Sequence, residues 1–414
     1  VDDYISELYF QLIRYKYRYA DIKFIEEWSD LRNRIFEYYG PYFNGDRLAG
    51  KIAREIIKDE SDRIKQVEML YNFVRDSIET RDYEGIVGSR LQSSRITLKD
   101  RGGSRVDKNL LLLTMLREVG VSAYPVTIST RSHGRIYKNV PRLMAFNNTV
   151  VLARTNRKDV FLDTRDRFCP FGMLPPGDIT NHGLLITENS YKFIDIPEPV
   201  SVSMYRADTR SAVLSSTGAL EVSQILRFEG YRNRLYRSRL EESESPESFV
   251  ETHILDEIKG AQLDTISILN RNDVRLPLLA EIRYTLPEFA DVIGEYLYFS
   301  PVLIHRLVEN PLQLENRSYP VEYIYPRIDQ EKIEIKLPEN CVITELPENR
   351  TYNTHGIKFQ RRIFAAEGSL KYHRWFYISK TKLPAQYYDD LKDLYSRIVQ
   401  ADKDQIVGTL KQES

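Results

Sequence analysis

The spacing of apolar residues predicts helices in the first part of the chain. Between residues 25 and 78, apolar and aromatic side chains recur at the spacing of amphipathic helices. Ser61 and Asp62 interrupt this stretch and offer oxygens that can cap a helix N-terminus. Residues 96–122 carry the apolar run Leu110 to Leu113 and end near Gly120, which is typical of a buried helix with a glycine C-cap.

Short apolar segments after this helix predict strands at 123–130, 149–153 and 160–163. A helix followed by consecutive short strands indicates a helix backed by an antiparallel sheet. Beyond about residue 198 the pattern becomes β-rich, with alternating segments separated by Pro, Gly and Asn turns. One helix is predicted within it, near 245–258, and a terminal helix with one apolar face at 385–401.

The N-terminal residues combine two β-like patterns. Residues 4–13 alternate in the manner of a strand, and the segment RYKYRY at 14–19 alternates tyrosine with basic side chains. This second segment fits an edge strand whose Lys and Arg side chains face water. A surface on which sugars or bases stack is the alternative interpretation.

Length and charge narrow the class of protein. A chain of 414 residues is long enough for two or three domains. It has 59 Lys and Arg against 60 Asp and Glu, so no overall positive field favours nucleic acid, and we expect no nucleic-acid partner. No apolar run approaches the roughly 20 residues of a membrane-spanning helix. The chain begins with Val1 and shows no signal peptide, which suggests that the numbering starts inside a longer product.

The residues that commonly bind metals and cofactors are sparse. Cys169 and Cys341 lie far apart without a C-x-x-C motif, so a disulfide framework and a cysteine zinc site are excluded, although one long-range disulfide remains possible. The histidines are dispersed without metal-binding spacing. The Gly-containing segments at 45–50 and 100–104 lack a phosphate-loop lysine. We therefore expect neither a metal nor a cofactor.

Three segments carry a family resemblance: RGGSRVDKNLLLLTMLREVGVSAYPVTISTRSHG at 101–134, FNNTVV at 146–151 and VFLDTRD at 160–166. Together with PFGMLPPG at 170–177 they resemble the bacterial transglutaminase-like superfamily. In its active members a papain-like core places a nucleophilic Cys at the start of a helix, and His and Asp on the following strands. The resemblance covers about residues 1–200, and the later segments are similar to the β-rich C-terminal module of the same multidomain exported proteins.

The resemblance implies an α+β multidomain fold with a papain-like transglutaminase core, followed by antiparallel β-sandwich-like modules. The expected domains are a residual strand of a preceding β-domain at 1–20, the core at 21–197, a β-rich module with one helix at 198–290, and a C-terminal β-domain with the terminal helix at 291–414. It also implies export to the periplasm or the outer-membrane surface.

Aligned residue by residue, the resemblance implies a degenerate catalytic triad. Asp107 and Asn109 anchor the alignment and put Arg105 at the cysteine position. The histidine position falls on Asn148, or on Asn147 if the strand slips by one residue, and Asp163 takes the aspartate position. A guanidinium stays protonated and has no lone pair for attack, and an amide is no general base. The family's acyl transfer is therefore not expected.

Several alternatives remain open at this site. Ser104 is a possible substitute nucleophile if a one-residue gap is allowed, although no neighbouring histidine base is evident. Cys169 is either a displaced nucleophile or a buried structural thiol. His133 is either a base or a polar group of a turn. Arg105 either pairs with Asp163 or is solvated at the helix start.

Three functional classes follow from these alternatives. The first is a pseudoenzyme that binds a peptide, protein or glycan. The second is an active transglutaminase-like cysteine or serine hydrolase or acyltransferase that acts on amide bonds through Ser104 or Cys169. The third is a structural spacer between exported domains, which would have no groove at the old site. We expect the first.

Overall fold

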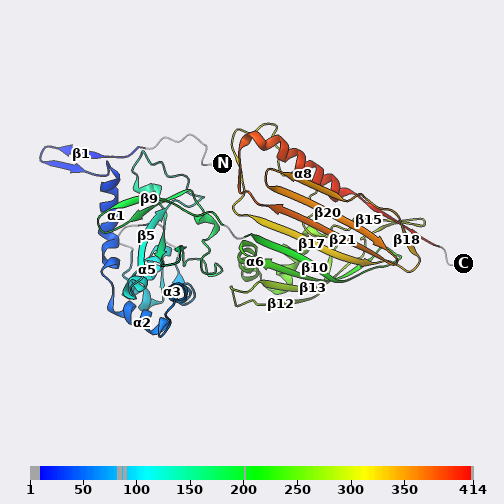
Figure 1. The fold of residues 1–414 in the computed structure, drawn as a ribbon, viewed down its shortest axis with the longest axis horizontal. Helices are drawn as coiled ribbons and strands as arrows, with labels where there is room; N and C mark the ends of the chain where they lie inside the picture. The colour runs from blue at the N-terminus through cyan, green and yellow to red at the C-terminus, as the bar shows by residue number, and fades with distance from the viewer. Residues whose placement is uncertain (1–9, 82–85, 87–90, 200–201, 412–414) are drawn as a thin grey trace. The chain divides into compact units, whose positions relative to one another are not determined.

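The computed structural model describes residues 10–81, 86, 91–199 and 202–411, and the chain forms two compact units, residues 1–198 and 199–414 (Figure 1). Unit 1 holds the helices and a five-stranded sheet, and unit 2 is dominated by an eight-stranded sheet. The protein is thus a mixed α+β structure with several sheets, as the residue pattern predicted. Most of its strand pairs are antiparallel. None of the helices in the described residues is both long and apolar enough to cross a bilayer.

The helices of unit 1 form where the apolar spacing predicted them. Asp46 and Asp62 cap the second and third helices with their side-chain oxygens, because each carboxylate accepts backbone N–H groups of the first turn. The region 96–122 contains two helices rather than one, since Arg101 adopts a left-handed conformation that ends the first. The five helices are α1 (Trp28–Phe43), α2 (Arg47–Ile57), α3 (Arg63–Ser77), α4 (Ser94–Asp100) and α5 (Arg105–Glu118).

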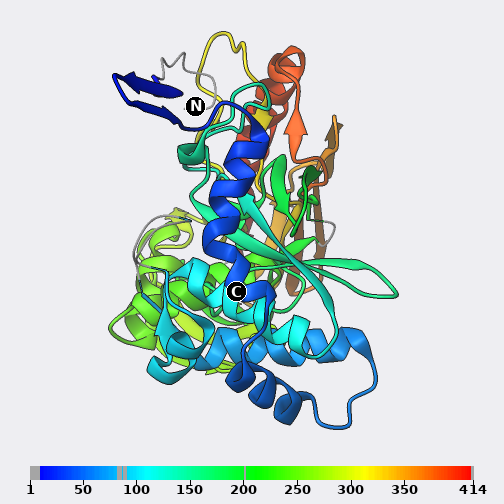
Figure 2. The same ribbon diagram turned by 90° about the vertical axis from the view of Figure 1, so that its left-hand side faces the viewer.

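The five-stranded sheet of unit 1 has the order β7-β6-β5-β8-β9, and its neighbours are all antiparallel. Helix α5 is buried nearly all round and shares one apolar core with α1–α3 and the sheet. Figure 2 looks onto α1, whose Trp28 packs edge-on against Phe193 of β9 with ring centroids 4.8 Å apart. The strands are β5 (Ser122–Ile128), β6 (Asn148–Arg154), β7 (Asp159–Leu162), β8 (His182–Ile186) and β9 (Tyr191–Asp195).

Two small sheets complete unit 1. The RYKYRY segment forms β1 (Arg14–Tyr17) and turns back through β2 (Ala20–Lys23) as an exposed hairpin. This agrees with a strand whose basic side chains face water. The strand expected at 4–13 lies outside the described residues except for its last four positions, 10–13, which form no strand. Two further short strands, β3 (Glu79–Thr80) and β4 (Gly102–Gly103), pair in parallel just before α5.

Unit 2 is built on a sheet of order β12-β13-β11-β10-β17-β21-β20-β19. Strands from 198–290 and strands from 291–414 share this sheet, since β10 pairs in parallel with β17. Alternating burial along β17 and β21 shows a sheet covered on one face. Its strands are β10 (Ser203–Leu214), β11 (Leu220–Glu229), β12 (Gln262–Leu269), β13 (Leu278–Leu286), β17 (Arg327–Lys336), β19 (Arg350–Thr354), β20 (Ile357–Ala366) and β21 (Ser369–Ile378).

The remaining strands of unit 2 form smaller sheets. A four-stranded sheet has the order β14-β15-β23-β18, and β16 pairs with β22. These strands are β14 (Asp291–Ile293), β15 (Tyr296–Phe299), β16 (Val321–Glu322), β18 (Cys341–Glu345), β22 (Lys382–Leu383) and β23 (Ile406–Leu410). The terminal helix α8 (Tyr388–Lys403) packs its predicted apolar face on β20 and β21.

One helix of unit 2 is not evident from the apolar pattern. The basic segment RNRLYRSR lies in α6 (Tyr231–Glu242), ahead of the expected helix, which is α7 (Pro246–His253). From the sequence, this basic segment would be expected to balance the acidic residues that follow it, but its Arg237 does not do so. It is buried and donates to the backbone carbonyls of Arg271, Asp273 and Leu276. Sequence reasoning missed this helix because a buried arginine resembles a solvated one.

Candidate functional site

The start of α5, where the family's nucleophile would stand, is tightly capped. The Ser104 hydroxyl accepts the backbone N–H of Asp107 (3.1 Å) and donates to Asp107 Oδ2 (2.8 Å), while the backbone N–H of Ser104 donates to the same carboxylate (2.9 Å). This is a capping box, in which two side chains satisfy the free donors of the helix end. Ser104 is only 1% exposed. Its hydroxyl is therefore occupied and closed to a substrate.

Arg105 occupies the first helical position and is half-buried. It makes no hydrogen bond or ion pair with any residue that the structure describes, so the pairing with Asp163 considered from the sequence is not formed. The guanidinium opposite Asp163 comes from Arg165 instead, with Nε 3.3 Å from Asp163 Oδ2. Arg165, two residues after Asp163 in the same loop, thus supplies the positive charge beside this carboxylate.

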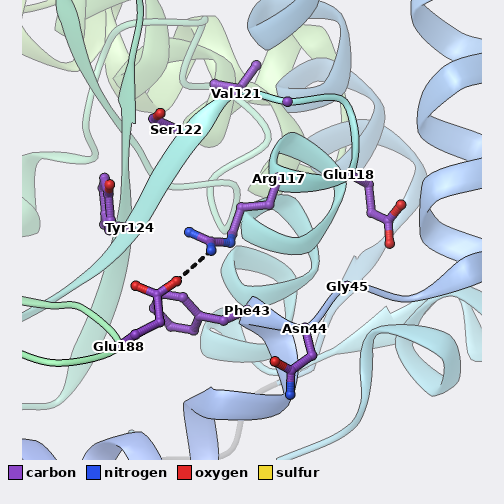
Figure 3. A pocket seen from close by; sticks show the side chains of 10 residues that line it. Phe43, Asn44, Gly45, Arg117, Glu118, Val121, Ser122, Tyr124 and Glu188 are labelled. Carbon is purple, nitrogen blue, oxygen red and sulfur yellow. Dashed lines mark hydrogen bonds and ion pairs between the residues drawn. The ribbon is translucent and has the colours of Figure 1, made fainter.

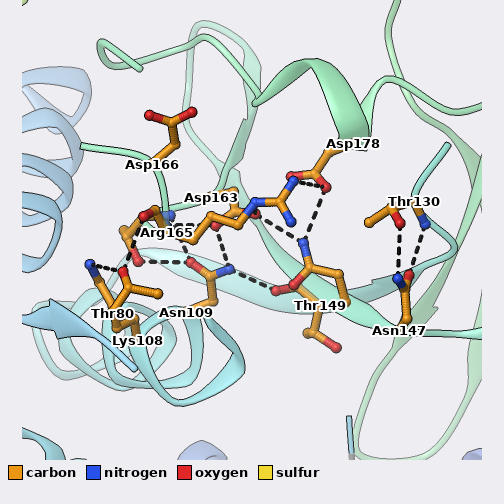
Figure 4. A network of polar contacts seen from close by, with 12 residues as sticks. Thr80, Lys108, Asn109, Thr130, Asn147, Thr149, Asp163, Arg165, Asp166 and Asp178 are labelled. Carbon is orange, nitrogen blue, oxygen red and sulfur yellow. Dashed lines mark hydrogen bonds and ion pairs between the residues drawn. The ribbon is translucent and has the colours of Figure 1, made fainter. Parts of the chain in front are cut away.

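Asn148 and Asp163 are in direct contact. Asn148 begins β6 and Asp163 follows β7, and the amide Nδ2 donates to Asp163 Oδ2 across 2.9 Å. Figure 4 shows Asp163 in this network together with Asn109, Arg165 and Asp178. Asn147 instead bonds Thr130 through both its amide oxygen and nitrogen (2.9 Å each). Since alternate residues of a strand point to opposite faces, only one of the two asparagines can reach the carboxylate. That residue is Asn148.

Two further side chains close the network around Asp163. Asn109 of α5 donates to Asp163 Oδ1 (3.0 Å) and to the carbonyl of Thr149 (2.8 Å). Asp178 accepts from Asn148 (3.2 Å) and from Arg165 Nη2 (2.7 Å). Asn109, Asn148, Asp163 and Asp178 are all 0% exposed. The network holds together α5, β6 and the loops after β7, and none of these four side chains meets solvent.

The pKa values of the two carboxyl groups in the network, Asp163 and Asp178, are shifted in opposite directions. Burial alone would raise the pKa of Asp163, but the charge of Arg165 and the hydrogen bonds it accepts lower that pKa below its ordinary value. Burial and the neighbouring charge of Asp163 raise the pKa of Asp178 well above its ordinary value. Asp163 is therefore the carboxyl of the pair that favours the ionised form beside the guanidinium of Arg165.

Lys108 is the most unusual basic group near this network. Its side chain is only 2% exposed, and its Nζ donates to Thr80 Oγ1 at 3.0 Å. Burial lowers its pKa to about 8, partly opposed by the charge of Asp163. The sequence did contain a signal, because a lysine just before the apolar run of a helix expected to be buried is unexpected. Arg165 and Asp178 carried no comparable signal, since Arg165 lies in a loop and Asp178 in a single 3-10 turn.

The other candidate nucleophile and base lie elsewhere. Cys169 is fully buried, and its carbonyl oxygen accepts from Tyr71 (3.0 Å) and Arg75 (3.1 Å). His133 sits in an exposed loop and bonds the carbonyl of Met144 (2.8 Å). Neither residue touches the Asn148–Asp163 pair in the described contacts. Neither cysteine is in a disulfide, and Cys341 belongs to unit 2.

The described residues of unit 1 also contain a cavity of about 500 Å³, shown in Figure 3. It surrounds the C-terminal end of α5, where Arg117 bonds Glu188 at 2.6 Å. The helix has 14 residues. At a rise of about 1.5 Å per residue, roughly 20 Å separate this cavity from Arg105. The cavity is therefore distinct from the Asn148–Asp163 network. Within the described part of the chain no cluster of His, Cys, Asp and Glu is placed to hold a metal ion.

Comparisons with known proteins bear on the fold. The family model of DUF3858, a domain of unknown function with a solved structure, matches residues 295–408. A crystal structure of a candidate protease from Parabacteroides distasonis is similar to 92% of this chain, with a TM-score of 0.52 and 12% sequence identity. The chain spans 58% of that protein. No curated protein sequence matches. At this identity the likeness concerns the fold alone.

Proposed function

We propose that unit 1 is a catalytically degenerate transglutaminase-like domain with a papain-like core, and that the protein acts by binding a peptide, protein or glycan. The observation that carries this proposal is the contact of Asn148 with Asp163. An amide here stands where a triad would need an imidazole, and an amide cannot accept a proton at neutral pH. The helix start opposite it carries Arg105, which cannot attack a carbonyl.

The surroundings of this pair support a structural role. Asp163 is ion-paired to Arg165 and hydrogen-bonded by Asn109, so its carboxylate is saturated. Ser104 is engaged in the helix cap, and Cys169 is fully buried. Neither of these nucleophiles considered from the sequence is therefore accessible to a substrate. Export to the periplasm or the outer-membrane surface belongs to this proposal and rests on the family resemblance.

The test is an amidase and transamidase assay on the purified chain. Wild-type protein is incubated with a glutamine-containing peptide and a primary amine, and ammonia release, peptide cleavage and amine incorporation are followed. We expect none of the three. Turnover that disappears in Ser104→Ala or Cys169→Ala would establish the hydrolase or acyltransferase instead.

A second arm addresses binding. The same protein is titrated calorimetrically with unmodified peptides, with denatured protein and with peptidoglycan-derived glycans. Saturable binding of one of these classes without turnover supports the proposal. Absence of both turnover and binding would favour a spacer between domains and refute the binding role. The double variant Arg105→Cys with Asn148→His serves as a comparison for the turnover assay. Labelling of its introduced thiolate would show that a reactive nucleophile at this site can be detected.

A further inference from the structure

Unit 2 contains a pocket of about 440 Å³ that the proposed function of unit 1 does not use. It lies between β17, β21 and α8, and the loop after β15 closes one side. Its residues come from both sides of position 290, because Arg232 of α6 joins residues 305–395 in the lining. A cavity of this volume suits a small organic ligand. We refer to it as the unit 2 pocket.

Two of the four arginines of the unit 2 pocket are held by carboxylates. Arg232 donates to Asp329 at 2.5 Å, and Arg374 forms a two-point bond with Asp402 at 2.8 and 3.0 Å. Arg374 and Asp402 are almost fully buried. The position of Arg374 is thereby fixed, since a guanidinium held at two points has little freedom.

The other two arginines donate no hydrogen bond to a carboxylate among the described residues, although Arg327 forms a loose ion pair with Asp329. Arg306 is exposed and makes no hydrogen bond or ion pair with any described residue. Arg327 donates no hydrogen bond within the described chain, and its nearest carboxylate oxygen, Asp329 Oδ2, lies 3.6 Å from Nε. Because a guanidinium carries five N–H donors, this end of the pocket offers donors that the protein leaves without acceptors.

The charge of the pocket favours a single negative charge on the ligand. The lining carboxylates are Asp329, held by Arg232, and Glu257, which lies 3.3 Å from His305 Nδ1. With Asp402 behind Arg374, three carboxylates face four guanidinium groups, so one positive charge is in excess. A dianion would be drawn to the arginines but repelled by Asp329. A planar monoanion matches the fork of a guanidinium.

Part of the pocket lining is apolar and aromatic. Leu312, Val321 and Phe376 line it beside Tyr323 and Tyr395, whose hydroxyl groups bond each other at 2.9 Å. Because these two hydroxyls satisfy one another, the rings present their apolar parts to a ligand. The pocket thus combines guanidinium N–H groups that donate no hydrogen bond within the described chain with an apolar surface.

We infer that the unit 2 pocket binds a small carboxylate with an apolar body, with Arg327 and Arg306 holding the carboxylate and the Leu312–Phe376 wall covering the body. Two sources share this chemistry: a free aromatic or branched carboxylic acid, and the C-terminal carboxylate of a peptide that ends in an apolar residue. The inference is independent of the chemistry at Asn148 and Asp163.

The test is calorimetric titration of the whole chain with 3-phenylpropanoate, and with its neutral amide as the matched ligand. Saturable binding of the acid, with the amide binding about tenfold more weakly or not at all, is expected from the loss of a charge-assisted contact. N-acetyl-Ala-Phe and its C-terminal amide separate the sources. Binding of the peptide acid as well assigns a peptide C-terminus, whereas binding of 3-phenylpropanoate alone assigns a free acid.

Variants locate the binding. Arg327→Gln is expected to weaken binding of 3-phenylpropanoate about tenfold. Arg306→Gln is expected to weaken it as well, and this exposed residue has no contacts whose loss would unfold the chain. Arg397→Gln, on the exposed face of α8 and outside the pocket, is the control and should bind as wild type. Equal binding of acid and amide, unchanged binding in both pocket variants, or binding of inorganic phosphate in place of the acid would overturn the inference.

Discussion

The amide of Asn148 donates to the carboxylate of Asp163 across 2.9 Å in a fully buried network. In the degenerate triad proposed above, this amide would take the place of the base, but it has no basic nitrogen. The network can stabilise the packing of α5, β6 and the loop after β7. Its contribution to the free energy of unfolding can be measured.

Asp163→Asn is expected to destabilise unit 1 by about 3 kcal/mol, because it leaves Arg165 and the donors of Asn148 and Asn109 facing a group that cannot satisfy them all. Chemical denaturation followed by circular dichroism measures this change. Asp159→Asn is the matched control, since Asp159 is exposed on β7 and pairs loosely with Arg154 at 3.7 Å. A loss below about 0.5 kcal/mol in Asp163→Asn, the size of a surface substitution, would contradict a structural role for the network.

Ser104→Ala is expected to cost about 1 kcal/mol of stability, the usual cost of losing a helix N-cap. The hydroxyl both accepts from and donates to Asp107, so its loss opens the capping box at the start of α5. Thermal unfolding measures the change, with Ser104→Thr as the variant that keeps a capping hydroxyl. Full stability of the alanine variant would show that the hydroxyl has no capping role.

We predict that the stability of unit 2 depends on pH because of the buried carboxyl group of Glu331. Burial raises its pKa from the ordinary 4.5 to about 8, although Arg374 and the N–H groups of Ile304 and Leu303 oppose the rise. Between pH 4.5 and about pH 8, Glu331 carries a proton in the folded chain that it has lost in the unfolded chain. The free energy of unfolding contributed by this residue therefore falls as the pH rises through that window.

Glu331→Gln removes this dependence, because its amide does not titrate. Between about pH 5.5 and about pH 7.5 the variant should gain about 3 kcal/mol relative to wild type, measured by urea denaturation at both pH values. Glu334→Gln on the same strand is the control, since its carboxylate is exposed and pairs with Lys371 at 3.4 Å. If both variants follow the wild type at both pH values, Glu331 is ionised in the folded chain.

The two cysteines are expected to be unreactive in the folded chain and to react fully after denaturation. Cys169 is 0% and Cys341 6% exposed, and burial also raises the pKa of Cys341, which lowers its thiolate fraction. Titration with a chromogenic disulfide reagent, before and after addition of urea, measures this. Rapid reaction of one thiol in the native chain would revive Cys169 as a candidate nucleophile. No reaction after denaturation without reductant would indicate a disulfide.

The residue pattern by itself determined the broad architecture. The helical spacing at 25–78 and the alternation beyond 198 predicted helices and strands near their observed positions, because burial of one face imposes these periods on the sequence. It did not reveal α6, whose buried Arg237 is satisfied by carbonyls from the loop 271–276. These carbonyl partners lie far from Arg237 along the chain, so the local spacing of residues does not predict them.

The tertiary structure alone decided the details of the site. The sequence offered Asn147 or Asn148 as the residue facing Asp163, and the register of β6 against β5 and β7 selects Asn148. It suggested Arg105 as a partner of Asp163, whereas the loop after β7 brings Arg165 there. Asp178 likewise reaches the network of unit 1 only when distant strands and loops pack. The same holds, separately, for the arginines that line the unit 2 pocket. Local periodicity reports which face of an element is buried, and only the packing of those faces reports which polar groups meet.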